Sequence, residues 1–171
     1  MTTAAPTRGA VIMAWLVVVL TVVFLTLGLV WYGVSWEVNQ RIWRDIFGRT
    51  DGPMTFRFVL QPAMAGIVAL HDGIRDAQGG RAPYLRTVLS DPAKRTARLR
   101  EGLLSIARII LLGFGMDAIY QWRVLGVFYP VEAIIITLIL AVVPYVILRG
   151  PIDRIARWWM ARHASSPAGQ N

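Results

Sequence analysis

Two ionisable side chains, Arg108 and Asp117, stand inside an otherwise uncharged apolar stretch that covers residues 103–122. Charged groups inside a membrane segment cost ~2.5 to 3.5 kcal/mol on insertion scales, and they often mark ion paths or proton relays. A separation of nine residues puts the two side chains on opposite faces of one helix, about 13 Å apart along its axis. We therefore expect no mutual pair, and we expect Arg108 to snorkel toward the cytoplasmic end of this helix.

Asp117 lies about one turn from Tyr120 and Gln121, and Arg57 flanks another apolar stretch. A carboxylate at this depth forms a buried structural pair with an arginine, accepts hydrogen bonds near the outer interface, or handles protons. The sequence leaves these roles open. The candidate intramembrane polar residues are Asp117, Arg108, Tyr120, Gln121 and Arg57.

Other polar residues give weaker signals for chemistry. His71 and Asp72 could in principle act as a general base and the carboxylate that orients it. However, adjacent residues of a helix do not face each other, and no nearby serine offers a nucleophile. A lipid-active enzyme would require His71, Asp72 and Asp76 to converge on one pocket. Gly113 and Gly115 are spaced as in a potassium-channel filter, but a continuous apolar run precedes them, so we expect them to thin or bend a helix where another crosses.

The composition excludes several classes of protein and site. The 171 residues include no cysteine and two histidines, which excludes disulfides, thiolate metal sites and all-imidazole metal cages. We predict no catalytic residue, cofactor or metal. With 56% hydrophobic and 16% charged residues, the chain is not an ordinary soluble domain. Its net charge of +8 is typical of lysine and arginine in the loops beside membrane spans rather than of a nucleic-acid-binding surface. Such basic residues also attract anionic lipid headgroups.

Three apolar stretches predict an all-α integral membrane protein with three transmembrane helices. They cover residues 11–33, 103–122 and 131–148, and each has roughly the ~20 residues that cross a bilayer core. The first follows a short N-terminal segment, residues 1–10, and ends near Trp31 and Tyr32. It is too long for a signal-peptide core and lacks a cleavage site, so we interpret it as an uncleaved anchor.

Interfacial amphipathic helices are expected between and after these spans. In residues 34–53 and 151–163, tryptophans and isoleucines alternate with arginines at helical spacing. Arg149, Gly150 and Pro151 are expected to close the last span. A basic cytoplasmic stem is expected at residues 79–102, with a helix that Asp91 caps and Pro92 begins, and a disordered tail at residues 164–171.

The segment 54–78 is ambiguous. Its uncharged section, residues 58–70, has only 13 residues and contains Pro62, which is short for a span. We expect an interfacial or re-entrant helix. The alternative is a short spanning helix with tilt or local thinning, which gives four transmembrane helices.

The distribution of lysine and arginine predicts the orientation. One basic residue precedes the first span, eleven lie in residues 34–102, and four follow from Arg149 onward. The positive-inside rule then places residues 72–102 and the C-terminus in the cytoplasm. With three spans the N-terminus is outside, and with four it is inside.

Three short stretches carry a resemblance to a known group of proteins. FRFVLQPAMA at 56–65, MDAIYQ at 116–121 and LRGP at 148–151 resemble segments of small uncharacterised bacterial inner-membrane proteins. The resemblance covers residues 55–155. It implies residence in the bacterial inner (plasma) membrane and no activity, substrate or catalytic residue.

The sequence favours a non-enzymatic membrane protein, an accessory or scaffold subunit that packs against itself or a larger complex. The alternative is an oligomeric channel or transporter subunit that uses Asp117 and Arg108 in its path. A second alternative is a lipid-active membrane enzyme. A wet cavity at Asp117 would favour transport, and a dry helix contact would favour the scaffold.

Overall fold

The computed structural model describes residues 6–33, 35–48 and 55–164, and every regular element in this part of the chain is helical. Residues 1–5, 34, 49–54 and 165–171, which include parts of the expected surface helix and tail, lie outside it. In chain order the elements are α1 (Arg8–Tyr32), α2 (Trp36–Gly48), α3 (Arg57–Gln78), α4 (Tyr84–Ser90), α5 (Pro92–Tyr120), a π-helical turn η2 (Gln121–Leu125) and α6 (Pro130–Ala164).

Three of these helical stretches are long and apolar enough to cross a membrane. They are Arg8–Tyr32, Pro92–Leu125 and Pro130–His163. Nearly all of each predicted span falls within one of them, so the expectation of an all-helical chain with three candidate spans is confirmed. This pattern is that of a multi-pass membrane protein. The surface position expected for α2 stays a prediction.

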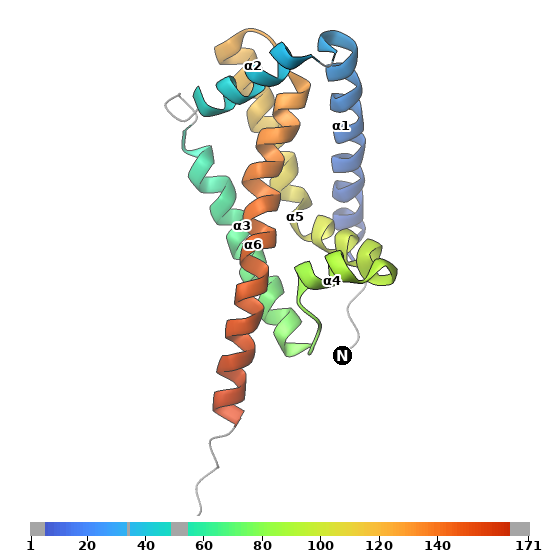
Figure 1. Ribbon diagram of the computed structural model, residues 1–171, viewed down its shortest axis with the longest axis vertical. Coiled ribbons are helices and arrows are strands. Elements are labelled where there is room, and N and C mark those ends of the chain that lie inside the picture. The colour runs from blue at the N-terminus through green and yellow to red at the C-terminus, as the bar shows by residue number, and fades with distance from the viewer. Residues whose placement is uncertain (1–5, 34, 49–54, 165–171) are drawn as a thin grey trace, which may run out of the picture.

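The long helices form a bundle in which the chain runs from end to end (Figure 1). α1 leads away from the end where the chain begins, α2 lies across the opposite end, and α3 returns. α5 then leads away again and α6 comes back, so the start of α1 and the end of α6 point to the same end (Figure 1). α3 packs chiefly against α6, and α1 packs against α5 and α6.

α3 is one continuous helix, and it is not among the three described helices that are long and apolar enough to cross a membrane. Its interfacial, re-entrant or spanning placement stays a prediction. Its 22 residues extend about 33 Å and continue through Pro62. The helix does not fold back, because Ala65 and Ala69 on its buried face are completely covered and Gly73 lies against Ile152 of α6. Small residues allow close approach of two helices over a long contact.

α6 differs from the expected division into two helices, because residues 131–148 and 151–163 belong to one helix of 35 residues. The interfacial placement of residues 151–163 stays a prediction. Pro144 and Pro151 lie inside it without ending it. Contacts on both sides of Pro151 hold the helix together: Arg149 is buried, and Asp153, also buried, accepts hydrogen bonds from Arg157 at 2.7 and 2.9 Å. The last turns are therefore coaxial with the span, and they reach beyond the other helices (Figure 1). Ala164, expected in the tail, is the last residue of α6.

The basic stem is partly as predicted. α5 begins at Pro92, and Asp91 Oδ1 accepts a hydrogen bond from the Lys94 N–H at 3.2 Å. That side chain also pairs with the Lys94 ammonium at 3.0 Å, and its hydrogen bond to Lys94 lowers the pKa of Asp91. The short helix α4 was not predicted. It interrupts residues 79–102, so the stem is a helix, a tight turn and the start of a second helix.

Of Gly113 and Gly115, whose spacing resembles that of a channel filter, only Gly113 lies at a close helix crossing. A Cβ atom on Gly113 would come within 2.6 Å of Thr137 Cγ2 and would also meet Gln61. A Cβ on Gly115 would meet no described atom within 4 Å. The expectation that a glycine thins this helix is thus confirmed for Gly113 and not for Gly115.

Candidate functional site

Arg57, Asp117 and Gln121 form a buried polar cluster, which we call the Asp117 cluster. Arg57 Nη1 donates to Asp117 Oδ1 at 2.5 Å, and Gln121 Nε2 donates to Asp117 Oδ2 at 2.5 Å. The three residues are 2%, 0% and 0% exposed. Both carboxylate oxygens therefore accept hydrogen bonds from buried side chains inside the protein.

Three helical elements and one connecting segment place this cluster. Arg57 begins α3, Asp117 lies in the last turn of α5, and Gln121 follows one turn later at the start of η2. The Gln121 amide also binds the chain that leads to α6: its Oε1 accepts the Tyr129 N–H, and its Nε2 donates to the Tyr129 carbonyl at 3.2 Å. The cluster thus fastens the start of α3 to the connection between α5 and α6.

Of the other two candidate residues, Arg108 lies apart from this cluster. Arg108 is exposed and forms no ion pair within the described part of the chain. Its exposure, against the complete burial of Asp117, agrees with the predicted opposite faces. Tyr120 is buried, at 7% exposure, in the last turn of α5. The residues that the fold brings together are Arg57, Asp117 and Gln121.

Further polar atoms lie next to this cluster on its inner side. Gln61 Nε2 donates to the Thr137 carbonyl at 3.3 Å. Within the described residues, Arg57 Nε and Nη2, Gln61 Oε1 and Thr137 Oγ1 are buried without a hydrogen-bond partner. Such atoms are costly, so this layer has unused capacity for hydrogen bonds.

A second cluster surrounds the guanidinium of Arg149, which is 1% exposed. Arg149 Nη2 lies 2.7 Å from Asp76 Oδ2 and 2.8 Å from Glu101 Oε1. Its Nη1 donates to the Tyr145 hydroxyl, which donates in turn to Asp72 Oδ2 at 2.8 Å. One cation therefore bridges acidic groups from α3 and α5.

A second arginine completes this Arg149 cluster. Arg98 Nη1 lies 3.1 Å from both Asp76 Oδ1 and Glu101 Oε2, and its Nη2 donates to a loop carbonyl at 2.8 Å. The Tyr84 ring covers Arg149, with 4.3 Å between Cζ and the ring centroid. Burial raises the pKa of Tyr84, which keeps its hydroxyl neutral beside the cluster.

The sequence did not predict the Arg149 cluster, although it named two of its acids as candidates for a lipid-active enzyme. Asp72 and Asp76 do meet, but the side chain of His71 is 73% exposed and lies 3.6 Å from Asp72 Oδ1. The three residues do not converge on one pocket. The missed signal was the spacing of four residues between Tyr145, Arg149 and the buried Asp153.

An apolar layer separates the two clusters. It contains alanines from α3 and α6 and isoleucines from α5, all 3% exposed or less: Ala65, Ala69, Ala141, Ile106 and Ile110. Gln61 and Asp72 stand on either side of it, eleven residues apart on α3, or about 16 Å along the axis. Among the described residues, no group of three or more histidine, cysteine or acidic side chains is arranged to hold a metal ion.

Comparison with known proteins adds no assignment: no protein-family model, no curated protein and no solved structure matches the chain.

Proposed function

We propose that the protein is a non-enzymatic accessory or scaffold subunit of a membrane assembly, in which the buried charges hold the helices in place. The observation that carries the proposal is the internal neutralisation of these charges. Arg57 pairs with Asp117, and Arg149 pairs with the carboxylates of α3 and α5. Groups that are paired and desolvated in this way are poorly placed to bind a substrate or shuttle protons.

The apolar layer supports the scaffold over the transport alternative. A path for ions or protons along α3 would have to cross the roughly 16 Å between Gln61 and Asp72, which the layer fills with buried alanine and isoleucine side chains. The alternative also used Arg108, which faces away from Asp117. The one observation that favours transport is the set of unpartnered buried atoms beside the Asp117 cluster, on Arg57, Gln61 and Thr137.

The proposed embedding has four crossing helices. Arg57 contacts Asp117 near the end of α5, and Asp76 contacts Arg98 near its start. These two contacts are nineteen residues apart on α3, or about 28 Å along the axis, which is close to the ~30 Å hydrocarbon core. This supports a crossing α3, with both termini on the cytoplasmic side of a bacterial plasma membrane in accordance with the positive-inside rule.

Cysteine labelling tests the embedding, because the chain has no cysteine of its own. Asn39 in α2 and Gln78 at the end of α3 are both exposed. We expect a membrane-impermeant maleimide added outside intact cells to label Asn39→Cys and to spare Gln78→Cys, which reacts only after lysis. A reporter fused after Asn171 gives the cytoplasmic reference. Labelling of both cysteines from the same side would mean that α3 does not cross.

The projecting end of α6 is the surface that best suits a partner. Ile155, Trp158 and Trp159 are 64%, 54% and 57% exposed, and their spacing of three and four residues puts them on one side of the helix. We call these three residues the aromatic face. Large apolar groups that remain exposed together are typical of contacts with proteins or membranes.

Site-specific photo-crosslinking tests the scaffold role. We expect a photoreactive amino acid at Trp159 to give a discrete crosslinked species in native membranes, either a dimer of this chain or a complex with one membrane protein. Replacing Ile155 and Trp158 by alanine should then remove that species. The matched control is the same probe at Trp122, which is 78% exposed and lies in η2, directly after α5. At this position the probe should give only lipid adducts. Absence of any species at Trp159 would contradict the proposal.

A further inference from the structure

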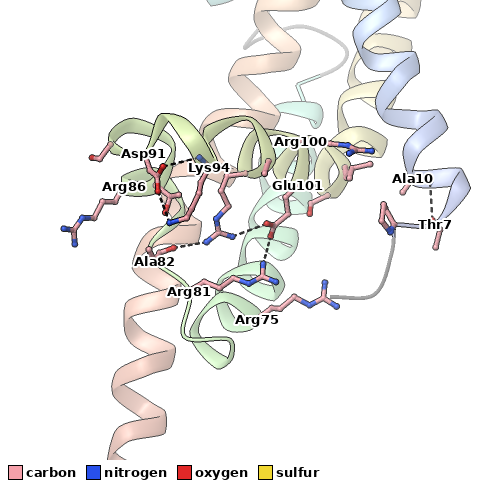
Figure 2. A pocket seen from close by; sticks show the side chains of 17 residues that line it. Thr7, Ala10, Arg75, Arg81, Ala82, Arg86, Asp91, Lys94, Arg100 and Glu101 are labelled. Atoms are coloured by element: carbon pink, nitrogen blue, oxygen red, sulfur yellow. Dashed lines mark hydrogen bonds and ion pairs between the residues drawn. The ribbon is translucent and has the colours of Figure 1, made fainter. Parts of the chain in front are cut away.

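A basic groove of about 1210 Å³ opens where α1 begins, between that helix, the last turn of α3, α4 and the first turns of α5 (Figure 2). Its lining has six basic and two acidic residues, so the lining carries a net charge of +4 (six minus two). They are Arg75, Arg81, Arg86, Lys94, Arg98 and Arg100 against Asp91 and Glu101.

Half of these basic residues already have acidic partners. Arg81 lies 3.2 Å from Glu101, Arg98 lies 3.1 Å from the same residue, and Lys94 lies 3.0 Å from Asp91. The two acids are thus used within the groove. The other three basic residues therefore decide what the groove attracts.

Arg75, Arg86 and Arg100 form no ion pair within the described part of the chain. Figure 2 shows Arg75 and Arg100 directed from α3 and α5 toward the side where Thr7 lies, whereas Arg86 points away from it. Two guanidinium groups from different helices therefore face one space without a counter-ion. Guanidinium forks bind phosphoryl oxygens through paired, charge-assisted hydrogen bonds.

The rest of the lining suits an acyl chain. Ala10 of α1 and Ala97 and Leu104 of α5 contribute apolar surface to the groove. Beyond the groove the outer surface of α1 is apolar, with Ile12 and Trp15 59% and 65% exposed. A ligand that fills the groove can therefore place a phosphoryl group at the arginines and a hydrocarbon chain along α1.

We infer that the basic groove binds the phosphoryl headgroup of an anionic phospholipid, held chiefly by Arg75 and Arg100. The inference rests on the proposed embedding, which puts the groove at the cytoplasmic surface of the bilayer. Free phosphate presents the same oxygens, but it leaves the apolar wall of Ala10 and Leu104 uncovered. The lipid uses both parts of the groove.

Native mass spectrometry of the full chain, released from mild detergent, measures the binding. We expect the wild type to retain phosphatidylglycerol in preference to phosphatidylcholine. An arginine near a lipid surface is worth about a fivefold change in binding, so Arg75→Gln and Arg100→Gln should each weaken phosphatidylglycerol binding about fivefold, and the double variant about 25-fold. Arg154→Gln removes an exposed arginine of α6 that does not line the groove; it is the control and should bind as the wild type does.

Added inorganic phosphate distinguishes the two sources of the phosphoryl group. Up to millimolar concentration it should displace no lipid. Displacement of phosphatidylglycerol by phosphate, or equal binding of the lipid by the double variant and the wild type, would overturn the inference. Thermal unfolding and maleimide labelling of Gln78→Cys are measured in the same variants. If the otherwise wild-type protein shows no preference for phosphatidylglycerol but Gln78→Cys is labelled as expected, the groove inference alone is refuted, whereas labelling of Gln78→Cys from outside intact cells refutes the embedding.

Discussion

Replacing Arg149 by leucine is expected to lower the free energy of unfolding by about 3 to 5 kcal/mol, the range for removal of one partner from a buried ion pair. The guanidinium is shared by Asp76 and Glu101 at 2.7 and 2.8 Å and holds the hydroxyl that binds Asp72. Its loss leaves neighbouring carboxylates from α3 and α5 with reduced neutralisation. Denaturation in mixed micelles of increasing dodecyl sulfate content measures the change.

Two further variants show whether the loss comes from the cluster. Arg154→Leu removes an exposed arginine from the same helix and should change the stability by less than about 0.5 kcal/mol. Adding Asp76→Asn to Arg149→Leu removes one of the stranded charges, so the double variant should recover part of the loss. Equal stability of Arg149→Leu and Arg154→Leu would show that the cluster does not hold α3 against α6.

Asp117→Leu is expected to have an effect of similar size, about 3 to 5 kcal/mol, because it strands the buried Arg57 cation. Asp117→Asn keeps the shape and a hydrogen-bond acceptor for Arg57, so we expect a smaller loss of about 2 kcal/mol. Removing both charges in Arg57→Leu with Asp117→Leu should restore most of the stability, since two apolar side chains can replace a buried pair at little cost. The same micelle titration measures all three variants.

The outcome for Asp117→Asn also separates the two roles of this carboxylate. In a structural pair, the cellular phenotype should follow the loss of stability. If the residue carries protons, Asp117→Asn abolishes function while the protein stays folded, and the scaffold proposal fails. Arg108→Leu is the control on the opposite face of the helix and should leave the stability nearly unchanged. An Asp117→Leu protein as stable as the parent would show that the pair with Arg57 contributes nothing.

The parts of the fold that depend on local pattern were predictable. The apolar lengths gave the candidate spans, and Asp91 followed by Pro92 gave the start of α5. Asp117 was identified as a candidate because a lone carboxylate stands out in an apolar stretch. Its partner Arg57 was named only as a separate candidate, since their contact joins residues sixty positions apart and depends on the path of α3.

The Arg149 cluster was missed for a related reason. Gly150 and Pro151 after an arginine are typical of the end of a span, and local rules give no reason for such an arginine to be buried. Its burial comes from α3, where Gly73 lets Ile152 approach and Asp76 supplies the counter-charge. Packing of this kind overrides a helix-ending signal, and only the four-residue spacing of polar residues on both helices could have indicated it.

A torque applied to one end of α6 would reach the other end, because neighbouring residues of an α-helix keep a fixed angle of about 100°. Thr137 lies beside the Asp117 cluster, Arg149 anchors the second cluster, and Trp159 stands beyond the bundle on the same unbroken helix. Ile152 is pressed against Gly73 between them, so turning the aromatic face also shears the contact with α3. If a molecule that binds the aromatic face favours one rotation of α6, that rotation would change the contacts of both clusters, and by reciprocity a change in either cluster would alter how tightly the molecule is held.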